Sequence, residues 1–360
     1  MAPARKPDLS VIIPSLNEEA ALPLLLDDLL CQEGVEFEVL VSDGGSTDAT
    51  CPLAKDLLVS CQMSHQILTG LPGRGRQLNR AVQEARGDWL LFLHADSRLP
   101  EKTAIAHGIH RLQDVHAAEG TCRVAAHFTL QFDVADGAKI DFDLFLSQAK
   151  AQLDEPGCTH GDQGFLLSRR FFEEVGPFRE DLPVMEDTWL AESVRRIGRW
   201  ELLSPAIRTS PRRFQSEGLQ KRQILNALLV NFLFVGWDDF LQQAPDLYRQ
   251  QADTGRLQLL PFWVEIKRQL RQLTLKKRLC LWYDTGRFVR SQAWQLVFRR
   301  AAWRLFLHEG VEGVVNDQGV HRFRRWFEPL TNHPVGALST GLLVWCWFSL
   351  FHAHLLRDER

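Results

Sequence analysis

Short apolar runs alternate with helix-like stretches through the first two hundred residues. Residues 9–13, 37–41, 66–68 and 89–93 are runs of the kind that form strands buried on both faces of a sheet. Between them, Ala- and Leu-rich or amphipathic stretches predict helices, notably at 17–30 and 77–85. This alternation predicts an α/β fold with a doubly wound, mostly parallel sheet.

The pattern continues to about residue 214 and then changes. Residues 122–132 read as a further strand at a sheet edge, and a polar loop at 159–164 leads into another strand. A short helix from Arg169 ends before Gly176-Pro177, and a longer helix is predicted from Met185 to Ile197. Beyond Gln215 only helical patterns remain. We therefore expect an α/β domain at 1–214, followed by a mainly α-helical, basic and aromatic region at 215–360.

Charge is unevenly distributed along the chain. The formal net charge is -3, yet residues 261–326 hold fourteen Lys and Arg against five Asp and Glu. Such segregation favours a surface that faces an anion, and a basic helical surface suits an anionic membrane. An ordinary solvated helical face explains the same run. No nucleic-acid-binding motif is recognisable, so we expect no nucleic-acid partner.

Residues 335–354 form an apolar stretch without Asp, Glu, Lys or Arg, about as long as the roughly 20 residues that a membrane span needs. Trp345 and Trp347 lie in the middle of this stretch instead of at its ends, which favours a buried or interfacial helix over a span. Both interpretations stay open. The apolar run at 224–234 is too short to cross a bilayer.

Cysteine usage and the N-terminus bear on the compartment. The seven cysteines are odd in number and form no CxxC pair, which argues against a disulfide framework and a structural zinc site. The first fourteen residues contain no long apolar stretch, so we read no signal peptide. We expect a cytoplasmic protein, peripheral to the inner face of the cell membrane or spanning it once.

Three predicted strands end in polar residues. The first is followed by Ser15-Leu16-Asn17-Glu18, the second by Asp43 and the fourth by His94-Ala95-Asp96. Because ligands of such sheets bind beyond the carboxyl ends of the strands, we expect these side chains on one rim. Asp43 could accept hydrogen bonds from a nucleobase or ribose, with Gly44 and Gly45 allowing close approach. A helix cap formed by Ser46, Thr47 and Asp48 accounts for the same turn.

Two further segments could contact a metal-bound diphosphate. Asp96 is a suitable ligand for Mg²⁺ or Mn²⁺, and His94 is acceptable to Mn²⁺. Alternatively, Asp96 caps a turn and His94 is a core residue. Residues 73–80, which include Arg76 and Asn79, form a basic, glycine-containing approach to a helix N-terminus that suits a phosphate. A solvated basic loop is the other interpretation.

Glu186-Asp187 opens a predicted helix and follows the polar loop that contains His160, Asp162 and Gln163. A carboxylate here could act as a general base on a hydroxyl. Acidic residues at a helix N-terminus are also favoured by the helix dipole alone.

Taken in order, these motifs resemble a family 2 glycosyltransferase with the GT-A fold, over about residues 8–214. The matching segments are 11–19, 43–48, 76–79, 92–96, 161–165 and 186–187. The Gly-Gly turn, the His94-Ala95-Asp96 variant, Gly161-Asp162-Gln163-Gly164 and residues 209–214 are most similar to the arsenosugar-biosynthesis-type subgroup.

The resemblance implies an enzyme, a glycosyltransferase of hexosyltransferase type that uses a nucleotide-sugar donor. Asp43 would bind the nucleoside, with Pro14, Asn17 and Glu18 lining the pocket, and Arg76, Asn79 and His94 would belong to the donor site. Asp96 would hold Mg²⁺ or Mn²⁺ on the diphosphate, and Asp187 beside Glu186 would deprotonate the acceptor for inverting transfer. The loop residues His160, Asp162 and Gln163 would face a small hydroxylated or lipid-linked acceptor.

Two departures from the family pattern refine this hypothesis. His94 replaces the first acid of the usual Asp-x-Asp motif, which leaves Asp96 as the better metal ligand. The Gln-x-x-Arg-Trp signature of processive enzymes is missing, so we expect one sugar per encounter, with Arg212 or Arg213 as a diphosphate contact. A sugar-nucleotide nucleotidyltransferase and a non-catalytic binding or membrane-scaffold protein remain alternatives.

Overall fold

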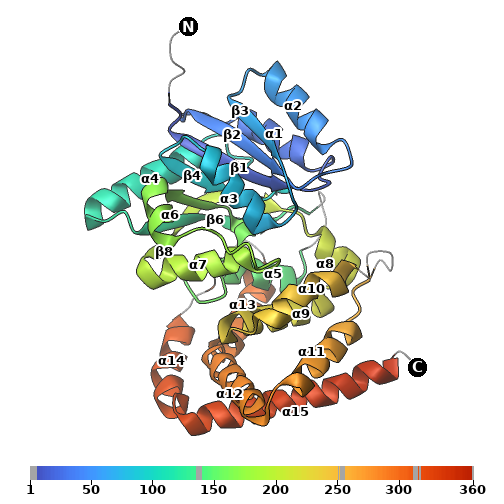
Figure 1. Ribbon diagram of the computed structural model, residues 1–360. Coiled ribbons are helices and arrows are strands. Elements are labelled where there is room, and N and C mark those ends of the chain that lie inside the picture. Colours follow the sequence, from blue (N-terminus) through green and yellow to red (C-terminus); the bar gives the residue numbers. More distant parts are fainter. Residues whose placement is uncertain are drawn as a thin grey trace. The chain divides into compact units, whose positions relative to one another are not determined.

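The computed structural model describes residues 6–134, 140–249, 251, 256–310, 315 and 318–358 (Figure 1). The chain forms two compact units. The first comprises Met1–Ala138 with Lys150–Pro211, and the second comprises Lys139–Ala149 with Arg212–Arg360. Residues 139–149, which lie inside the α/β domain expected from the sequence, are thus grouped with the C-terminal helices.

An eight-stranded mixed sheet forms the centre of the first unit, with strand order β3-β2-β1-β4-β7-β6-β8-β5. Four of its seven strand pairings are parallel, including all those among β1, β2, β3 and β4. The strands are β1 Leu9–Ser15, β2 Phe37–Asp43, β3 His65–Thr69, β4 Trp89–Phe92, β5 Ser97–Arg98, β6 Val124–Phe132, β7 Phe165–Ser168 and β8 Arg199–Thr209. The predicted α/β architecture, mostly parallel at its N-terminal end, is confirmed.

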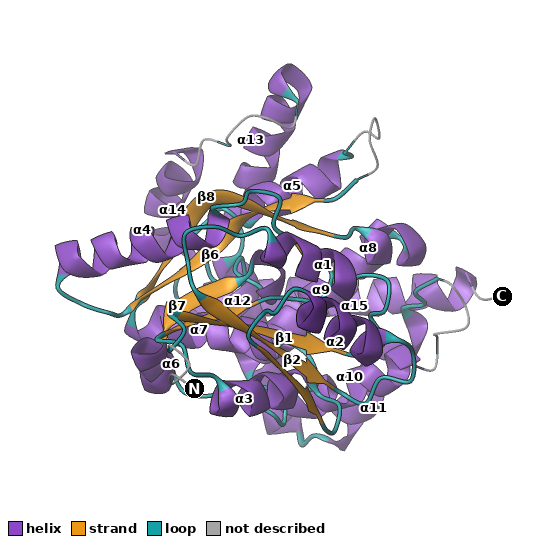
Figure 2. Cartoon of the chain, turned by 90° about the horizontal axis from the view of Figure 1, so that it is seen from above, coloured by secondary structure: helices purple, strands orange, loops and turns teal. Residues whose placement is uncertain are grey.

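Helices cover both faces of this sheet (Figure 2). Leu78 of α3, Phe171 of α6 and Leu190 of α7 pack in one apolar cluster with Ile12 and Phe165 of the sheet. On the opposite face, Gly108 lets α4 approach Leu166 and Leu203 closely. The helices are α1 Leu22–Leu30, α2 Thr50–Ser60, α3 Arg74–Glu84, α4 Ala104–Glu119, α6 Arg169–Val175 and α7 Glu186–Ile197, with a 3₁₀ turn η1 at Gly161–Gln163.

The structure corrects three details of the sequence-based expectation. The strand expected at a sheet edge is β6, which lies between β7 and β8. The first helix begins at Leu22, and the acids Glu18 and Glu19 precede it instead of occupying its first turn. The third helix begins at Arg74, so most of the expected basic loop is the first turn of α3.

The second unit is entirely helical in its described part, which confirms the expected α-helical C-terminal region. Its helices are α5 Phe142–Lys150, α8 Arg212–Glu217, α9 Leu219–Val235, α10 Asp238–Arg249, α11 Leu260–Gln272, α12 Leu275–Ser291, α13 Trp294–Glu309, α14 Gln318–Thr331 and α15 Pro334–Asp358. Buried aromatic side chains dominate its interior, among them Trp263, Phe262 and Phe298.

Helices α12 and α15 cross at two glycines. A Cβ atom on Gly286 would lie 2.1 Å from the carbonyl oxygen of Ala337, and one on Gly341 would lie 2.5 Å from that of Trp282. The backbones therefore touch at this crossing, as small residues allow. Within α15, Pro334–Arg357 is long and apolar enough to cross a membrane, and most of this segment is not buried inside the protein.

Candidate active site

The strand ends that carry the predicted site residues lie side by side, because β1 is flanked by β2 and β4. Ser15 is the register partner of Asp43 at the ends of β1 and β2. The buried Gln77 of α3 joins these ends, since its Nε2 donates hydrogen bonds of 2.8 Å to the carbonyl oxygens of both Ser15 and Ser42. The Gln77 side chain of α3 thus holds the ends of β1 and β2 together.

Asp43 is buried and hydrogen-bonded within its own turn. Its Oδ2 accepts from the backbone N–H groups of Gly45 at 2.8 Å and Ser46 at 2.9 Å. Its Oδ1 accepts from the hydroxyls of Ser46 at 2.5 Å and Ser15 at 3.4 Å. Burial alone would raise the pKa of Asp43, but these hydrogen bonds hold it below the usual range. The carboxylate therefore shapes the turn to which a ligand would bind.

The loops after β1 and β2 are joined to each other. Asn17, in the left-handed conformation with φ 55°, accepts a hydrogen bond on Oδ1 from Thr47 N at 2.9 Å. The backbone N–H of Glu18 donates to Thr50 Oγ1 at 2.8 Å. Pro14 is buried within β1. These contacts place the residues expected around the nucleoside in one ordered pair of loops.

Arg74 lies among the carboxylates of the rim, and the sequence did not single it out. Its Nε lies 3.0 Å from Glu186 Oε1, and its Nη1 lies 3.9 Å from Asp187 Oδ2 and 3.2 Å from His94 Nε2. Attraction to Glu186 is the largest cause that raises the pKa of Arg74, and Asp187, Asp96 and Asp162 contribute further. Arg74 keeps 35% of its side chain exposed. The only sequence signal was its place in a basic segment at a helix start.

Glu186 and Asp187, the first two residues of α7, have pKa values that are shifted in opposite directions. Burial raises the pKa of Glu186 to about 7, and Arg74 only partly offsets this effect. For Asp187, burial also favours the neutral form, but Arg74, His160 and His94 outweigh it and lower the pKa to about 2. Asp187 Oδ2 also accepts a hydrogen bond from Gly161 N at 2.9 Å. Asp187 is therefore ionised at neutral pH, whereas Glu186 is ionised only in part.

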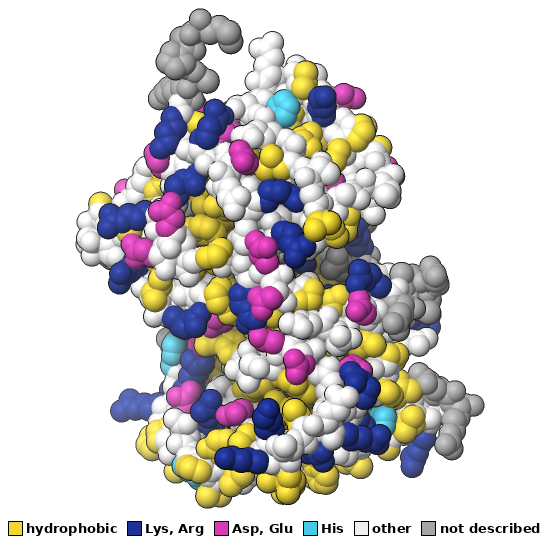
Figure 3. Space-filling view, viewed as in Figure 1, with side chains coloured by type: hydrophobic (Ala, Val, Ile, Leu, Met, Phe, Trp, Pro, Cys, Tyr) yellow, Lys and Arg dark blue, Asp and Glu magenta, His cyan; other side chains and the backbone are white. Residues whose placement is uncertain are grey.

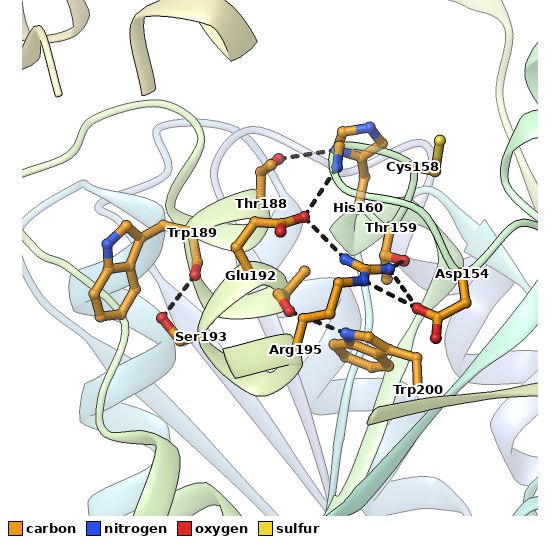
Figure 4. Close-up of polar contacts among 12 residues, drawn as sticks. Asp154, Cys158, Thr159, His160, Thr188, Trp189, Glu192, Ser193, Arg195 and Trp200 are labelled. Carbon is orange, nitrogen blue, oxygen red and sulfur yellow. Dashed lines mark hydrogen bonds and ion pairs between the residues drawn. The ribbon is translucent and has the colours of Figure 1, made fainter. Parts of the chain in front are cut away.

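A hydrogen-bond network holds the loop that carries His160 against α7 (Figure 4). The Nδ1 of His160 lies 2.9 Å from Thr188 Oγ1. Arg195, further along α7, donates hydrogen bonds to Thr159 Oγ1 at 2.9 Å and to Asp154 Oδ1 at 3.0 Å. Gln163 is buried, and its Nε2 donates to the carbonyl oxygen of Cys158 at 2.8 Å. Gln163 therefore stabilises the loop from inside.

Gly161 lies between the end of β4 and the start of α7. A Cβ atom at this position would be 2.6 Å from His94 Nε2 and 2.9 Å from Asp187 Oδ2. Only glycine lets the loop approach both side chains. The structure thus brings together His94, Gly161 and Asp187, which are far apart in sequence.

The acids of the rim fit a divalent cation bound through few protein ligands. Burial raises the pKa of Asp162 to about 6; His160 opposes this, and the negative charges of Asp187 and Asp96 add to it. Asp162 Oδ1 is buried and accepts no hydrogen bond from the described residues. Over those same residues, no group of three or more His, Cys, Asp and Glu side chains could hold a metal. Mg²⁺ typically uses one or two carboxylates together with substrate phosphates, so Asp96 suits this mode.

The remaining predicted residues have different surroundings. Asn79 is buried, and its amide binds the backbone of Phe178 in both directions, at 2.9 and 3.0 Å. Arg76 is half exposed, with Nε 3.6 Å from Glu180 Oε2. Arg212 begins α8 in the second unit and is exposed, and the Arg213 side chain lies outside the described residues. The contacts of Asn79 point to a role in holding the segment at Phe178.

These features define an α/β domain with an acidic, arginine-containing rim at its strand ends. Residues 10–175 match the family described as Glycosyl transferase family 2, so the N-terminal part of the chain is similar to domains of this type.

Individual proteins show the same likeness. A PGL/p-HBAD biosynthesis glycosyltransferase of Mycobacterium bovis is 38% identical over 103 residues, covering 28% of this chain and 40% of the relative. An uncharacterized protein of Mycobacterium tuberculosis is 38% identical over 210 residues, covering 53% and 63% of the two chains. The solved mannosyltransferase PcManGT of Pyrobaculum calidifontis, in complex with GDP-Man and Mn2+, has a TM-score of 0.46 at 16% identity, covering 96% and 88%. The chain thus spans less than two thirds of the curated relatives' length.

Proposed function

We propose that the protein is an inverting, non-processive glycosyltransferase that moves one sugar from a nucleotide-sugar donor to an acceptor hydroxyl, assisted by a divalent cation. The main support is the ionised Asp187 in the first turn of α7, which lies beside the Arg74 guanidinium and near His94, the residue that follows β4 by two positions. The match of residues 10–175 to Glycosyl transferase family 2 supports the same reaction class.

In this mechanism Asp187 accepts the proton of the acceptor hydroxyl while the hydroxyl oxygen attacks the anomeric carbon. The bond to the nucleoside diphosphate breaks in the same step, so the configuration inverts and no covalent enzyme intermediate forms. Hydrogen bonds from Gly161 N and Thr188 N, at 2.9 and 2.6 Å, orient the two Asp187 oxygens. Such a base contributes about 10²- to 10⁴-fold to the rate.

The donor would lie over the ends of β1, β2 and β4. The Asp43 turn and the loop at Asn17 would contact the nucleoside, and Arg76 and Arg74 offer positive charge to the diphosphate. Asp96, with His94 as a second candidate, would hold Mg²⁺ or Mn²⁺, which supplies charge neutralisation of the leaving group. His160 and Asp162 would face the acceptor.

The direct test separates donor binding from transfer. Asp187→Asn is expected to retain donor binding, measured by calorimetry with UDP- and GDP-sugars and Mn²⁺, and to lose at least about 100-fold in transfer rate. Asp181→Asn is the matched control, because Asp181 is an exposed acid paired with Arg179 in the same unit. Full transfer by Asp187→Asn would remove the general-base assignment.

Asp96→Ala tests the metal proposal on its own. We expect the variant to bind the donor with the same affinity with and without Mn²⁺, whereas the parent protein should bind more tightly with Mn²⁺. A metal-dependent affinity that survives Asp96→Ala would assign the cation to other residues.

Two other classes give different outcomes in these assays. A sugar-nucleotide nucleotidyltransferase would release pyrophosphate from a nucleoside triphosphate and a sugar phosphate. A non-catalytic scaffold would bind a nucleotide without turnover in the parent protein. Similarity to the arsenosugar-biosynthesis-type subgroup remains a prediction about the acceptor.

The second unit supports the proposal of attachment to an anionic membrane at the cytoplasmic face. Apolar side chains gather over the lower part of the molecule in Figure 3, with Lys and Arg close by. In α15, Leu342 and Leu343 are 60% and 69% exposed. We expect Leu342→Glu with Leu343→Glu to weaken flotation with phosphatidylglycerol vesicles. The control pair Leu53→Glu and Val59→Glu changes exposed apolar residues of α2, and its flotation should be unchanged.

A further inference from the structure

The helical unit contains a cavity of about 470 Å³. Its walls come mainly from α9, α11, α12 and α15, and thirteen of its nineteen lining residues are apolar. This volume lies within the roughly 300–1,000 Å³ of small-molecule sites, which are likewise mostly apolar. Ala227 and Trp347, both exposed, are among the lining residues, so the cavity is open to the outside.

The cavity is elongated along α9. Its lining follows one face of that helix from Gln220 to Phe232, which at 1.5 Å per residue is about 18 Å. The lining is polar at the first turn of α9, where Gln220 and Gln223 lie, and largely apolar from Ile224 onward. The other polar lining residues pair with each other, since Asn231 contacts Thr285 at 3.3 Å and Arg299 forms an ion pair with Asp143 at 3.1 Å. A long apolar surface with a polar end matches a hydrocarbon chain with a polar headgroup.

The same helix that exposes apolar side chains also closes this cavity. Val344, Trp347 and Phe348 of α15 line it, while Leu343 and Leu350 of α15 are about 70% exposed. Lys276 and Lys277 are exposed at the start of the adjacent α12, which places positive charge in the same unit. An apolar outer face, exposed cations and an open apolar cavity together favour a membrane lipid as the occupant.

We infer that this cavity binds the hydrocarbon chain of a membrane lipid, with the polar end of the ligand at Gln220 and Gln223. The chain is either acyl or isoprenoid, since both have the same apolar character. This site goes beyond the proposed sugar transfer and does not depend on it, because binding here can be measured without any nucleotide.

The test uses the full chain in detergent-free buffer and two probes, dodecanol for an acyl chain and farnesol for an isoprenoid chain. Calorimetry should show saturable binding of at least one probe at one equivalent. Ala227→Trp fills the cavity from an exposed position, and it should weaken that binding at least tenfold, or about 1.4 kcal/mol. Lys221→Trp is the matched control, because Lys221 is exposed on the same helix but does not line the cavity.

Each outcome is decisive. Binding that Ala227→Trp weakens and Lys221→Trp preserves supports the site, and the tighter probe identifies the chain. Ile224→Trp provides a second cavity-filling variant if Ala227→Trp does not fold, as judged by its thermal melt. Absence of saturable binding of both probes, or equal binding by parent and filled variants, would overturn the inference.

Discussion

Arg74 and Glu186 form a contact between the first turns of two helices that are far apart in sequence. Arg74 Nε lies 3.0 Å from Glu186 Oε1, and the Glu186 side chain is completely buried while Arg74 is 35% exposed. Neither Glu186 oxygen accepts a hydrogen bond among the described residues. The guanidinium is therefore the main compensation for the burial of this acid.

Arg74→Met should lower the free energy of unfolding by about 3 kcal/mol at pH 8, because Glu186 would be left buried without its cation. Urea unfolding followed by circular dichroism measures this change. Arg76→Met is the matched control, because the Arg76 and Glu180 side chains are 45% and 47% exposed and 3.6 Å apart. Its cost should stay below about 1 kcal/mol. Equal effects of the two substitutions would show that Glu186 does not need Arg74.

Gln77→Leu should destabilise the first unit by about 1 to 2 kcal/mol. The side chain fits the same space, but the carbonyl oxygens of Ser15 and Ser42 each lose a buried hydrogen bond. Gln66→Leu serves as the control, since Gln66 is only partly buried and makes a 3.5 Å contact with Glu84. Unfolding free energies that fall by the same amount in both variants would argue against the bridging role.

His127 should make the protein acid-sensitive. Burial lowers its pKa from 6.5 to about 4, with a smaller contribution from Arg195. Below pH 6.5 His127 becomes protonated in the unfolded chain, whereas in the folded chain it stays neutral down to about pH 4. Stability therefore falls as pH drops through this window, by about 3 kcal/mol for this group.

The variant His127→Leu should lose less stability than the parent between pH 6.5 and 4, as measured by urea unfolding at several pH values. His110→Leu changes an exposed histidine of α4 and leaves His127 in place. Its pH profile should follow that of the parent. Parallel profiles for all three proteins would assign the acid sensitivity elsewhere.

Gly341→Ala should destabilise the helical unit, although alanine is the better helix former. The new Cβ would lie 2.5 Å from the carbonyl oxygen of Trp282, so α15 must move away from α12 at a cost of about 1 to 3 kcal/mol. In α14, Gly319→Ala meets only Val297 Cγ1 at 3.6 Å and should be neutral or stabilising. A thermal melt of both variants compares them, and a Gly341→Ala protein as stable as Gly319→Ala would contradict the close crossing.

The elements predicted best from the sequence are those whose own residues form a clear apolar pattern. Continuous apolar runs predicted β1, β2 and β4, because a strand covered on both faces is mostly apolar, and the shorter run at 66–68 predicted the partly exposed edge strand β3. β8 was missed because Pro205 and several charged residues interrupt it. In the structure, Ser204 and Pro205 lie at an irregularity where Phe128 pairs with Leu203 and Thr129 with Ala206. Proline is tolerated in strands at such bulges.

The site was predictable in part for the same reason. Acids that follow a strand or open a helix can be read locally, so Asp43, Asp96 and Asp187 were singled out. The contact of Arg74 with Glu186 depends on how α3 and α7 pack, over more than a hundred residues of chain. Asn79 was also predicted from a local motif, as a donor-site residue. In the structure its side chain is hydrogen-bonded to the backbone of Phe178 instead.

The position of α15 has a practical consequence for preparing the protein. Since α15 supplies three residues of the cavity wall and meets α12 backbone to backbone, a shortened chain ending before Pro334 would lose the wall and uncover the Gly286 side of α12. Such a truncation would remove the exposed apolar face of α15, but it would expose the apolar cavity and the Gly286 side of α12 instead. Polar substitutions confined to the exposed Leu338, Leu342 and Leu350 are therefore the better way to obtain a sample that does not aggregate.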